Sequence, residues 1–223
     1  MAVSVDTVYQ TVLALANKEQ RGYITPQEFN LFANHAQMDI FEQYFYDLNQ
    51  FKRVPGNQSD YADMVSNLQD KISIFIRSTG SISSSTSQTL PEDFYRASLV
   101  TVDGNKAEHT SRENQEYYTS PLISPTKSRP IFYLHDNSIT FKPTGGTAVV
   151  SYIKKPTSPN WTYVVVNDKA LWNSNGVDFE LHPSEQQNLV VKIAKLAGIS
   201  MKDATLAQAA SSEEISNIQQ EKA

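Results

Sequence analysis

Cysteine is absent from the 223 residues of this chain. Disulfide bridges, cysteine nucleophiles and cysteine-ligated zinc sites are therefore excluded. Charged residues are also scarce, at 19%, where an average globular protein has about a quarter. No run of lysine and arginine appears, and the formal net charge is −5. This balance argues against a dominant nucleic-acid-binding surface.

Long apolar stretches are missing as well. No segment approaches the roughly 20 apolar residues that a membrane-spanning helix needs. Residues 1–10 show no basic segment followed by an apolar one, so we expect no secretory signal and a soluble protein made in a cytoplasm. Hydrophobic residues amount to only 39%, and uncharged polar residues take their place. Such a composition is typical of chains with extended surface or large contacts to partners.

The common motifs of enzyme active sites are absent too. The chain contains no G-x-S-x-G, no G-x-x-x-x-G-K-[ST] and no G-x-G-x-x-G. None of its histidines is spaced like a metal-binding pair. His182 precedes Pro183, which is typical of a position near a helix cap. We therefore expect no enzymatic activity, no cofactor and no metal. The histidines are His35, His109, His135 and His182.

What the sequence does contain is helical periodicity near both ends. The second segment has the broadest apolar face. In the last segment, Pro183 and Ser184 mark the start and Gly198 is expected to cap the end. The predicted helices are residues 3–18, 26–51, 58–77 and 183–199.

Between these helices the pattern changes to short strands. The pairs Asp103-Gly104 and Asp136-Asn137 are typical of tight turns between them. Residues 111–118 are expected to form a helical turn. The predicted strands are residues 97–102, 131–135, 138–142 and 147–154.

These elements predict an α+β protein. The N-terminal and C-terminal helices are expected to form a bundle, with a small antiparallel β-sheet or barrel-like region inserted between them. The tail is helix-permissive but weakly hydrophobic, so we expect it to order against a partner. The expected regions are an N-terminal helical region at 1–77, a Ser/Thr-rich linker or loop at 78–89, a β-rich region at 90–181, a returning helix at 182–199 and a C-terminal interaction tail at 200–223.

Residues 17–28, NKEQRGYITPQE, have the length of an EF-hand calcium loop. Position five is Arg21, which offers no acceptor and carries a permanent positive charge. The same residues also suit a joint between two helices, where Gly22 ends the first and Thr25 and Glu28 cap the second. We interpret the loop as structural, and a calcium-binding module stays the less favoured alternative. The ligands would be Asn17, Glu19, Arg21, Tyr23, Thr25 and Glu28.

The β-rich region carries several aromatic residues. They suit a glycan-binding surface, but aromatic residues in strands are favoured for packing alone. We expect them in a core or an interface. A carbohydrate-binding or tail-fibre-associated virion protein stays open as the alternative function. The residues are Phe132, Tyr133, Phe141, Tyr152, Trp161, Tyr163 and Trp172.

Four segments together carry a resemblance to a known class of protein. In this order, with helices first and a weakly anchored helix last, the layout resembles the head–tail connector proteins of short-tailed bacteriophages, also called adaptor, gatekeeper or ring proteins. The first segment is most similar to structural proteins of the crAss-like phages. The segments are NKEQRGYITPQEFNLFANHAQMDIFEQYFYD at 17–47, LPEDFYR at 90–96, SYIKKP at 151–156 and FELHPSEQQ at 179–187.

The resemblance implies a structural virion protein without catalytic residues. It implies a homo-oligomeric ring with the portal's twelvefold symmetry, assembled in the cytoplasm of a host bacterium. The ring would join the portal protein to further tail or ring proteins at the portal vertex and extend the DNA channel. The modest negative charge suits a conduit that contacts passing DNA only transiently. The expected interface residues are Phe41, Tyr44, Phe45 and Phe51 of the long helix, and Leu206, Ile215 and Ile218 of the tail.

Overall fold

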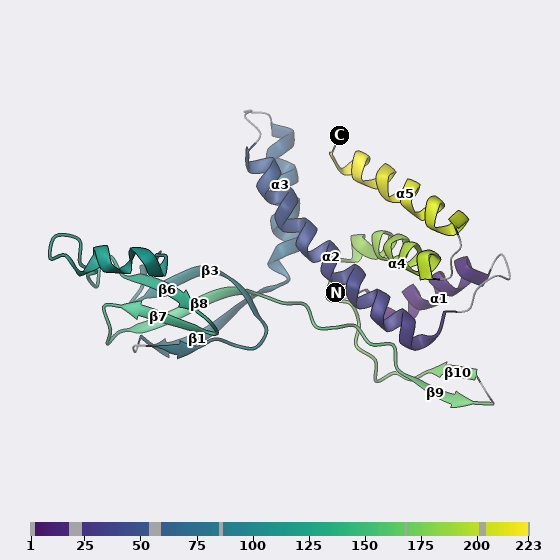
Figure 1. Ribbon diagram of the computed structural model, residues 1–223, viewed down its shortest axis with the longest axis horizontal. Coiled ribbons are helices and arrows are strands. Elements are labelled where there is room, and N and C mark those ends of the chain that lie inside the picture. The colour runs from purple at the N-terminus through teal and green to yellow at the C-terminus, as the bar shows by residue number, and fades with distance from the viewer. Residues whose placement is uncertain are drawn as a thin grey trace. The chain divides into compact units, whose positions relative to one another are not determined.

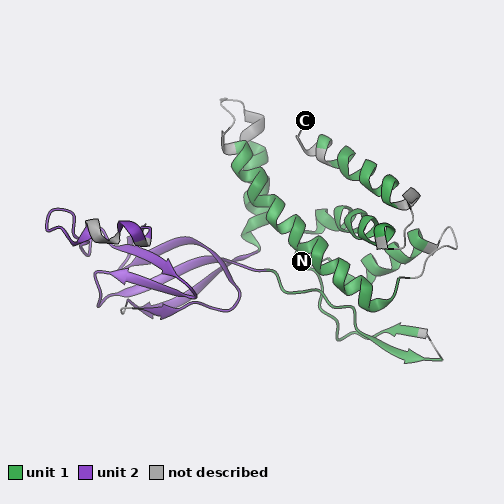
Figure 2. Ribbon diagram, in the orientation of Figure 1, with its two compact units in different colours: residues 1–74, 156–223 green, residues 75–155 purple. Residues whose placement is uncertain are grey.

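The computed structural model describes most of the chain, and the described residues form two compact units (Figure 2). Unit 1 comprises residues 1–74 and 156–223, and unit 2 comprises residues 75–155. The chain therefore leaves unit 1 after a helix, builds unit 2, and returns to complete unit 1. The described residues are 3–17, 24–53, 59–84, 87–167, 169–200 and 204–222.

Unit 1 is built mainly from helices (Figure 1). Helix α4 lies at its centre, because α1, α2 and α5 all pack against it, while α3 packs against α2. Helices from the two ends of the sequence therefore share one unit, in agreement with a mixed α and β protein. The described α-helices are α1 (Val5–Asn17), α2 (Pro26–Arg53), α3 (Ser59–Ser73), α4 (Gln186–Ser200) and α5 (Ala204–Lys222).

The core of unit 1 follows helical spacing. Val8 and Val12 of α1 lie one turn apart, and both are buried. Leu189 and Ile193 repeat this spacing on α4 and are fully enclosed. Burial of a side chain of this size stabilises a fold by roughly 1.5–3 kcal/mol. These buried side chains therefore hold α4 against the helices around it. No helix among the described residues combines the length and apolar character that crossing a lipid bilayer requires.

A two-stranded antiparallel hairpin completes unit 1. Its strands are β9 (Tyr163–Val166) and β10 (Lys169–Trp172). The predicted β-rich region 90–181 therefore spans both units. Its last segment belongs with the helices, because the backbone of Phe179 pairs with that of Val3, just ahead of α1.

Unit 2 consists of two four-stranded sheets, ordered β1-β8-β3-β4 and β2-β7-β6-β5. Neighbouring strands are antiparallel except β5 and β6, which run parallel. The 3-10 helix η1 (Arg112–Thr119) follows β5. The strands are β1 (Ile76–Ser83), β2 (Gln88–Thr89), β3 (Phe94–Val102), β4 (Asn105–Lys106), β5 (Glu108–His109), β6 (Ile131–His135), β7 (Ser138–Lys142) and β8 (Thr147–Lys154).

The two sheets of unit 2 share one hydrophobic core. Val100 and Val150 enter it from the first sheet, and Ile139 and Phe141 enter it from the second. Among the described residues neither sheet closes on itself, so the predicted barrel-like alternative is wrong and the predicted small antiparallel sheet is closer to the fold. The predicted strands 131–135, 138–142 and 147–154 are confirmed.

The predicted linker 78–89 is wrong, because most of it lies in strands β1 and β2. Strand β1 is polar and largely exposed, but its backbone pairs with β8. Ser84 is fully buried, and its Oγ accepts a hydrogen bond from the N–H of Gly146 at 2.6 Å. Backbone pairing makes no demand for apolar side chains, which is why composition alone suggested a linker.

Gly198 does not cap α4, which continues to Ser200. A side chain at position 198 would place its Cβ 2.9 Å from the backbone nitrogen of Ala207 in α5. This glycine therefore permits the close approach of α4 and α5, and the predicted cap is wrong. The predicted tail 200–223 contains α5, which lies against α4 of the same chain.

Candidate functional site

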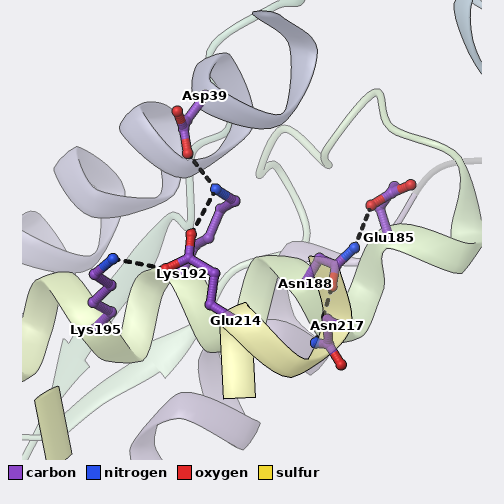
Figure 3. Close-up of polar contacts among 7 residues, drawn as sticks. All are labelled: Asp39, Glu185, Asn188, Lys192, Lys195, Glu214 and Asn217. Atoms are coloured by element: carbon purple, nitrogen blue, oxygen red, sulfur yellow. Dashed lines mark hydrogen bonds and ion pairs between the residues drawn. The ribbon is translucent and has the colours of Figure 1, made fainter. Parts of the chain in front are cut away.

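Charged side chains gather where α2, α4 and α5 meet (Figure 3). Lys192 of α4 donates hydrogen bonds to Asp39 of α2 and, at 3.0 Å, to Glu214 of α5. Lys195, one turn further along α4, donates to the other oxygen of Glu214 at 2.7 Å. Lys192 therefore links its own helix α4 both to α5, which follows it in the sequence, and to the distant α2.

The ion pairs shift the pKa values of Lys192 and Glu214. Burial disfavours the charged form of Lys192, but the hydrogen bonds and charges of Asp39 and Glu214 outweigh it and raise the lysine's pKa. Burial also disfavours the charged form of Glu214, but the two lysines outweigh it and lower the carboxyl's pKa. Both shifts favour the ionised pair at neutral pH, so the network stabilises the packing of α5 against α4.

A second polar group lies beside the first and is centred on Glu185 of the 3-10 helix η2 (Pro183–Glu185), whose carboxylate is almost completely buried. Lys71 of α3 contacts one carboxylate oxygen at 2.5 Å, and Asn188 of α4 donates to the other at 2.9 Å. Asn217 of α5 in turn donates to Asn188 at 3.3 Å. Because both oxygens have partners, the buried charge is compensated.

These two groups border a cavity of about 190 Å³ in unit 1. The two lysines of its lining, Lys71 and Lys192, both pair with carboxylates. Among the described residues, no group of three or more His, Asp and Glu side chains is placed to hold a metal ion. The arrangement therefore joins helices of unit 1. Its apolar lining comprises Ile40, Tyr44, Phe51, Met64, Leu68 and Val191.

The predicted interface residues on the long helix are placed mostly inside the chain. Phe41 is fully buried and packs edge-on against Phe45, with ring centroids 5.1 Å apart. Tyr44 is buried as well, and Phe51 lines the cavity. Phe41 and Tyr44 therefore belong to the core of unit 1, because α2 packs on two neighbouring helices and has more than one apolar face.

Of the three predicted interface residues of the tail, the structure describes the side chain of one. Ile215 is 57% exposed on α5 and remains available to a partner. The side chains of Leu206 and Ile218 lie outside the described residues. Glu214 and Asn217, the polar side chains that attach α5 to α4, were not predicted from the sequence. Their role depends on Lys192, Lys195 and Asn188, which no local pattern connects to them.

The calcium-loop residues are partly described, and those that are form a helix cap. The N–H of Thr25 donates to Glu28 at 3.0 Å, and the N–H of Glu28 approaches the Thr25 hydroxyl at 3.3 Å. The Thr25 backbone N–H, and after it the Thr25 hydroxyl, which donates to the same carboxylate at 2.8 Å, lower the pKa of Glu28. The predicted capping box is therefore confirmed, and the carboxylate needed as the twelfth ligand is engaged in it. Glu19, Arg21 and Tyr23, and the side chain of Asn17, lie outside the described residues.

Several of the aromatic residues weighed as a glycan platform are core residues. Phe132, Phe141 and Tyr152 are buried in unit 2. Trp161 is buried in unit 1, where its indole N–H donates to Asp6 at 2.9 Å. The predicted packing role is confirmed for these four residues.

His182 caps η2, as its position before Pro183 predicts. Its Nδ1 accepts a hydrogen bond from the N–H of Ser184 at 3.2 Å. The ring thereby supplies a partner to the first exposed backbone donors of the helical segment. This use of the imidazole is structural.

The β9–β10 hairpin was not predicted from the sequence. Its strands carry Val164, Val165 and Val166 on one side of the turn and Leu171 on the other, and all four are exposed. The run of β-branched and aromatic residues ahead of Asn167 was the available signal. An apolar hairpin of this kind offers a surface for a partner.

No protein-family model and no curated protein matches this sequence. The function therefore has to be inferred from the residues and their arrangement.

Proposed function

We propose that this chain is a structural virion protein that forms a ring at the portal vertex. In this proposal the ring joins the portal protein to further tail or ring proteins and extends the DNA channel. The proposal starts from the resemblance of residues 17–47, 90–96, 151–156 and 179–187 to connector proteins of short-tailed bacteriophages.

The observation that carries the proposal is the exposed apolar hairpin. Val165 of β9 is 62% exposed, and its neighbours along the strand are exposed to a similar degree. Leu122, in the loop after η1 of unit 2, is 95% exposed. Apolar groups concentrated on a hairpin and a loop are costly in water and typical of surfaces that an assembly covers. A chain that works in a large assembly accounts for both.

Two further features support the same role. The charged side chains that border the cavity of unit 1, such as Lys192, form ion pairs that join helices, which is a structural use of charge. The overall charge of −5 disfavours tight binding of DNA, which suits a channel wall.

Native mass spectrometry tests the proposal directly. The purified chain is measured alone and with the portal protein of the same virus, in buffer that contains calcium. We expect a species of many copies, either free or on the portal, with no mass from bound calcium. A chain that stays monomeric in both samples would refute the ring. A trimer that binds glycans, and loses this binding on Trp172→Ala, would establish the carbohydrate-binding alternative instead.

The C-terminal segment of the chain has its own test. Removal of residues 200–223 deletes α5, which is expected to contribute to portal attachment through exposed groups such as Ile215. We expect the truncated chain to lose the portal. Attachment that is unchanged by the truncation would remove the tail from the interface.

A further inference from the structure

Exposed apolar residues lie on both strands of the hairpin. Val164 lies directly opposite Leu171 in the register of β9 and β10, so both side chains point to the same side of the hairpin. Val166 lies on that side as well, because side chains alternate along a strand. Val165 points to the other side. Strand β9 therefore carries apolar groups on both faces and no charge.

The base of the hairpin is held in place by unit 1. Trp172 packs against the buried Trp161, with ring centroids 5.7 Å apart. A Cβ at Gly176 would lie 2.3 Å from the ring of Trp172, so only glycine fits beneath the indole. Thr162 and Asn173 bond across the base, with the N–H of Asn173 donating to the carbonyl of Thr162 at 2.9 Å. The exposed strands are therefore presented from a packed anchor.

Unit 2 contains a groove lined by both apolar and charged residues. It has a volume of about 590 Å³ and lies beside β3, β5 and β6. Leu99 of β3 is 43% exposed in it, although it is a large apolar side chain. Charged residues such as Arg96, Lys106 and Glu108 also line it. The apolar lining residues are Ala97, Leu99, Val100, Ala107, Phe132 and Leu134.

The same groove runs along a strand edge. Strand β4 pairs with β3 only at Thr101 and Val102. In the described part of the chain, residues 96–99 of β3 thus have β8 on one side and no strand on the other. An open edge of this kind is a template for another strand, which bonds to it through backbone groups and places alternate side chains in the adjoining groove.

We propose that the β9–β10 hairpin of one copy docks in this groove of a second copy, with β9 added to the open edge of β3. The lengths agree, because β9 has four residues and the open edge spans residues 96–99. The chemistry agrees as well, since β9 is uncharged and apolar and Leu99 and Val100 line the groove. Docking would cover the exposed valines and the edge of β3 at once.

The size of the contact indicates a closed assembly rather than a pair. Four strand residues span on the order of 13 Å, and two strands are about 10 Å wide with their side chains, so one face covers far less than the roughly 800 Å² per partner of a stable interface. The hairpin and the groove are different surfaces, so each copy can place its hairpin on one neighbour and accept the hairpin of another in its groove. Such head-to-tail contacts form rings when the rotation closes. The inference rests on the proposed ring and names the contact between its neighbours.

The lack of cysteine allows a direct test by cross-linking. Val165→Cys and Leu99→Cys are made as separate variants, so each chain carries a single thiol. The two variants are mixed, with the portal protein if the ring needs it, and treated with a short bismaleimide. We expect a cross-linked dimer that contains one chain of each kind. The matched control replaces Leu99→Cys with Ser81→Cys, on the opposite edge strand β1 of the same sheet, and is expected to give none.

A second variant separates this inference from the proposed function. Val165→Lys puts a charge into the contact and is expected to abolish the assembly in native mass spectrometry. Leu31→Lys, an equally exposed leucine on α2, is expected to leave it intact. The far-UV circular dichroism spectra of both variants should match that of the parent, because both side chains are exposed in the single chain and contribute little to its fold.

The outcomes distinguish the two ideas. If the assembly persists in Val165→Lys and no cross-link forms between positions 165 and 99, the contact between hairpin and groove is overturned. The proposed ring is not affected by that result. Cross-linking of Leu99→Cys to the portal protein instead of to Val165→Cys would assign the groove to a different partner and would also overturn the contact between hairpin and groove. A chain that never assembles would overturn the proposed function as well.

Discussion

Replacing Gly198 by alanine should reveal whether α5 packs closely against α4 in solution. Two effects of opposite sign act at this position. Alanine is better than glycine inside a helix by up to about 1 kcal/mol. Its Cβ, however, would lie 2.9 Å from the backbone nitrogen of Ala207, a distance that forces the two helices apart.

The magnitude follows from these two terms. Overpacking of a well-packed contact costs about 1–3 kcal/mol. If α5 is seated as described, Gly198→Ala is therefore expected to lower the free energy of unfolding by between roughly 0 and 2 kcal/mol, after the helix-propensity gain of about 1 kcal/mol is subtracted. If α5 leaves α4, the overpacking disappears and the same substitution should stabilise the chain.

The assay is urea denaturation followed by circular dichroism, applied to four proteins. They are the full chain and a chain that ends at Ser200, each with Gly198 and with Gly198→Ala. We expect alanine to destabilise the full chain and to stabilise the truncated one, because the truncated chain has no α5 to collide with. Stabilisation by the same amount in both backgrounds would refute the close packing of α4 on α5.

Three further predictions concern individual contacts. Thr25→Ala should lower the free energy of unfolding by about 1 kcal/mol through loss of the helix cap, and urea denaturation with and without calcium should give the same loss; rescue by calcium would contradict the structural interpretation of the loop. Trp161→Ala should destabilise by about 3–5 kcal/mol as a buried aromatic truncation, whereas Trp172→Ala, at a side chain 36% exposed, should cost clearly less in the same assay. The pKa of Glu214 is lowered from 4.5 in the folded state, so its stabilising effect is fully present above pH 4.5 and is lost as the pH falls through the lowered value. Protection factors for hydrogen exchange of residues 204–222, which correct for the intrinsic pH dependence of amide exchange, should therefore fall at acid pH in the parent and fall less in Glu214→Gln; an equal fall in both would argue against the ion pairs with Lys192.

The sequence predicted those elements that are specified by residues close to one another along the chain. The cap of α2 was readable because Thr25 and Glu28 are three residues apart and satisfy each other's backbone donors. Strands β6, β7 and β8 were readable from alternation and turn residues, and their bounds agree with those of the structure. His182 was readable as a cap because Pro183 follows it.

Features whose partners are distant in the sequence were not readable. Gly198 looks like a helix end, and only the position of Ala207 on α5 shows that it makes room for a neighbouring helix. The polar segment 78–89 looks like a linker, and only its pairing with β8 makes much of it a strand. The side chains of Phe41 and Tyr44 look available, and only the neighbouring helices bury them.

The sequence by itself determined the mixed α and β class, the positions of many helices and strands and the cap of α2, because spacing, capping and turn chemistry act within a few residues. The tertiary structure alone decided which charges meet around Lys192 and which apolar groups stay exposed on β9 and around Leu99. Long-range contacts settle these points. Burial and ion pairing depend on which segments meet, and periodicity along one segment carries no record of its distant partner.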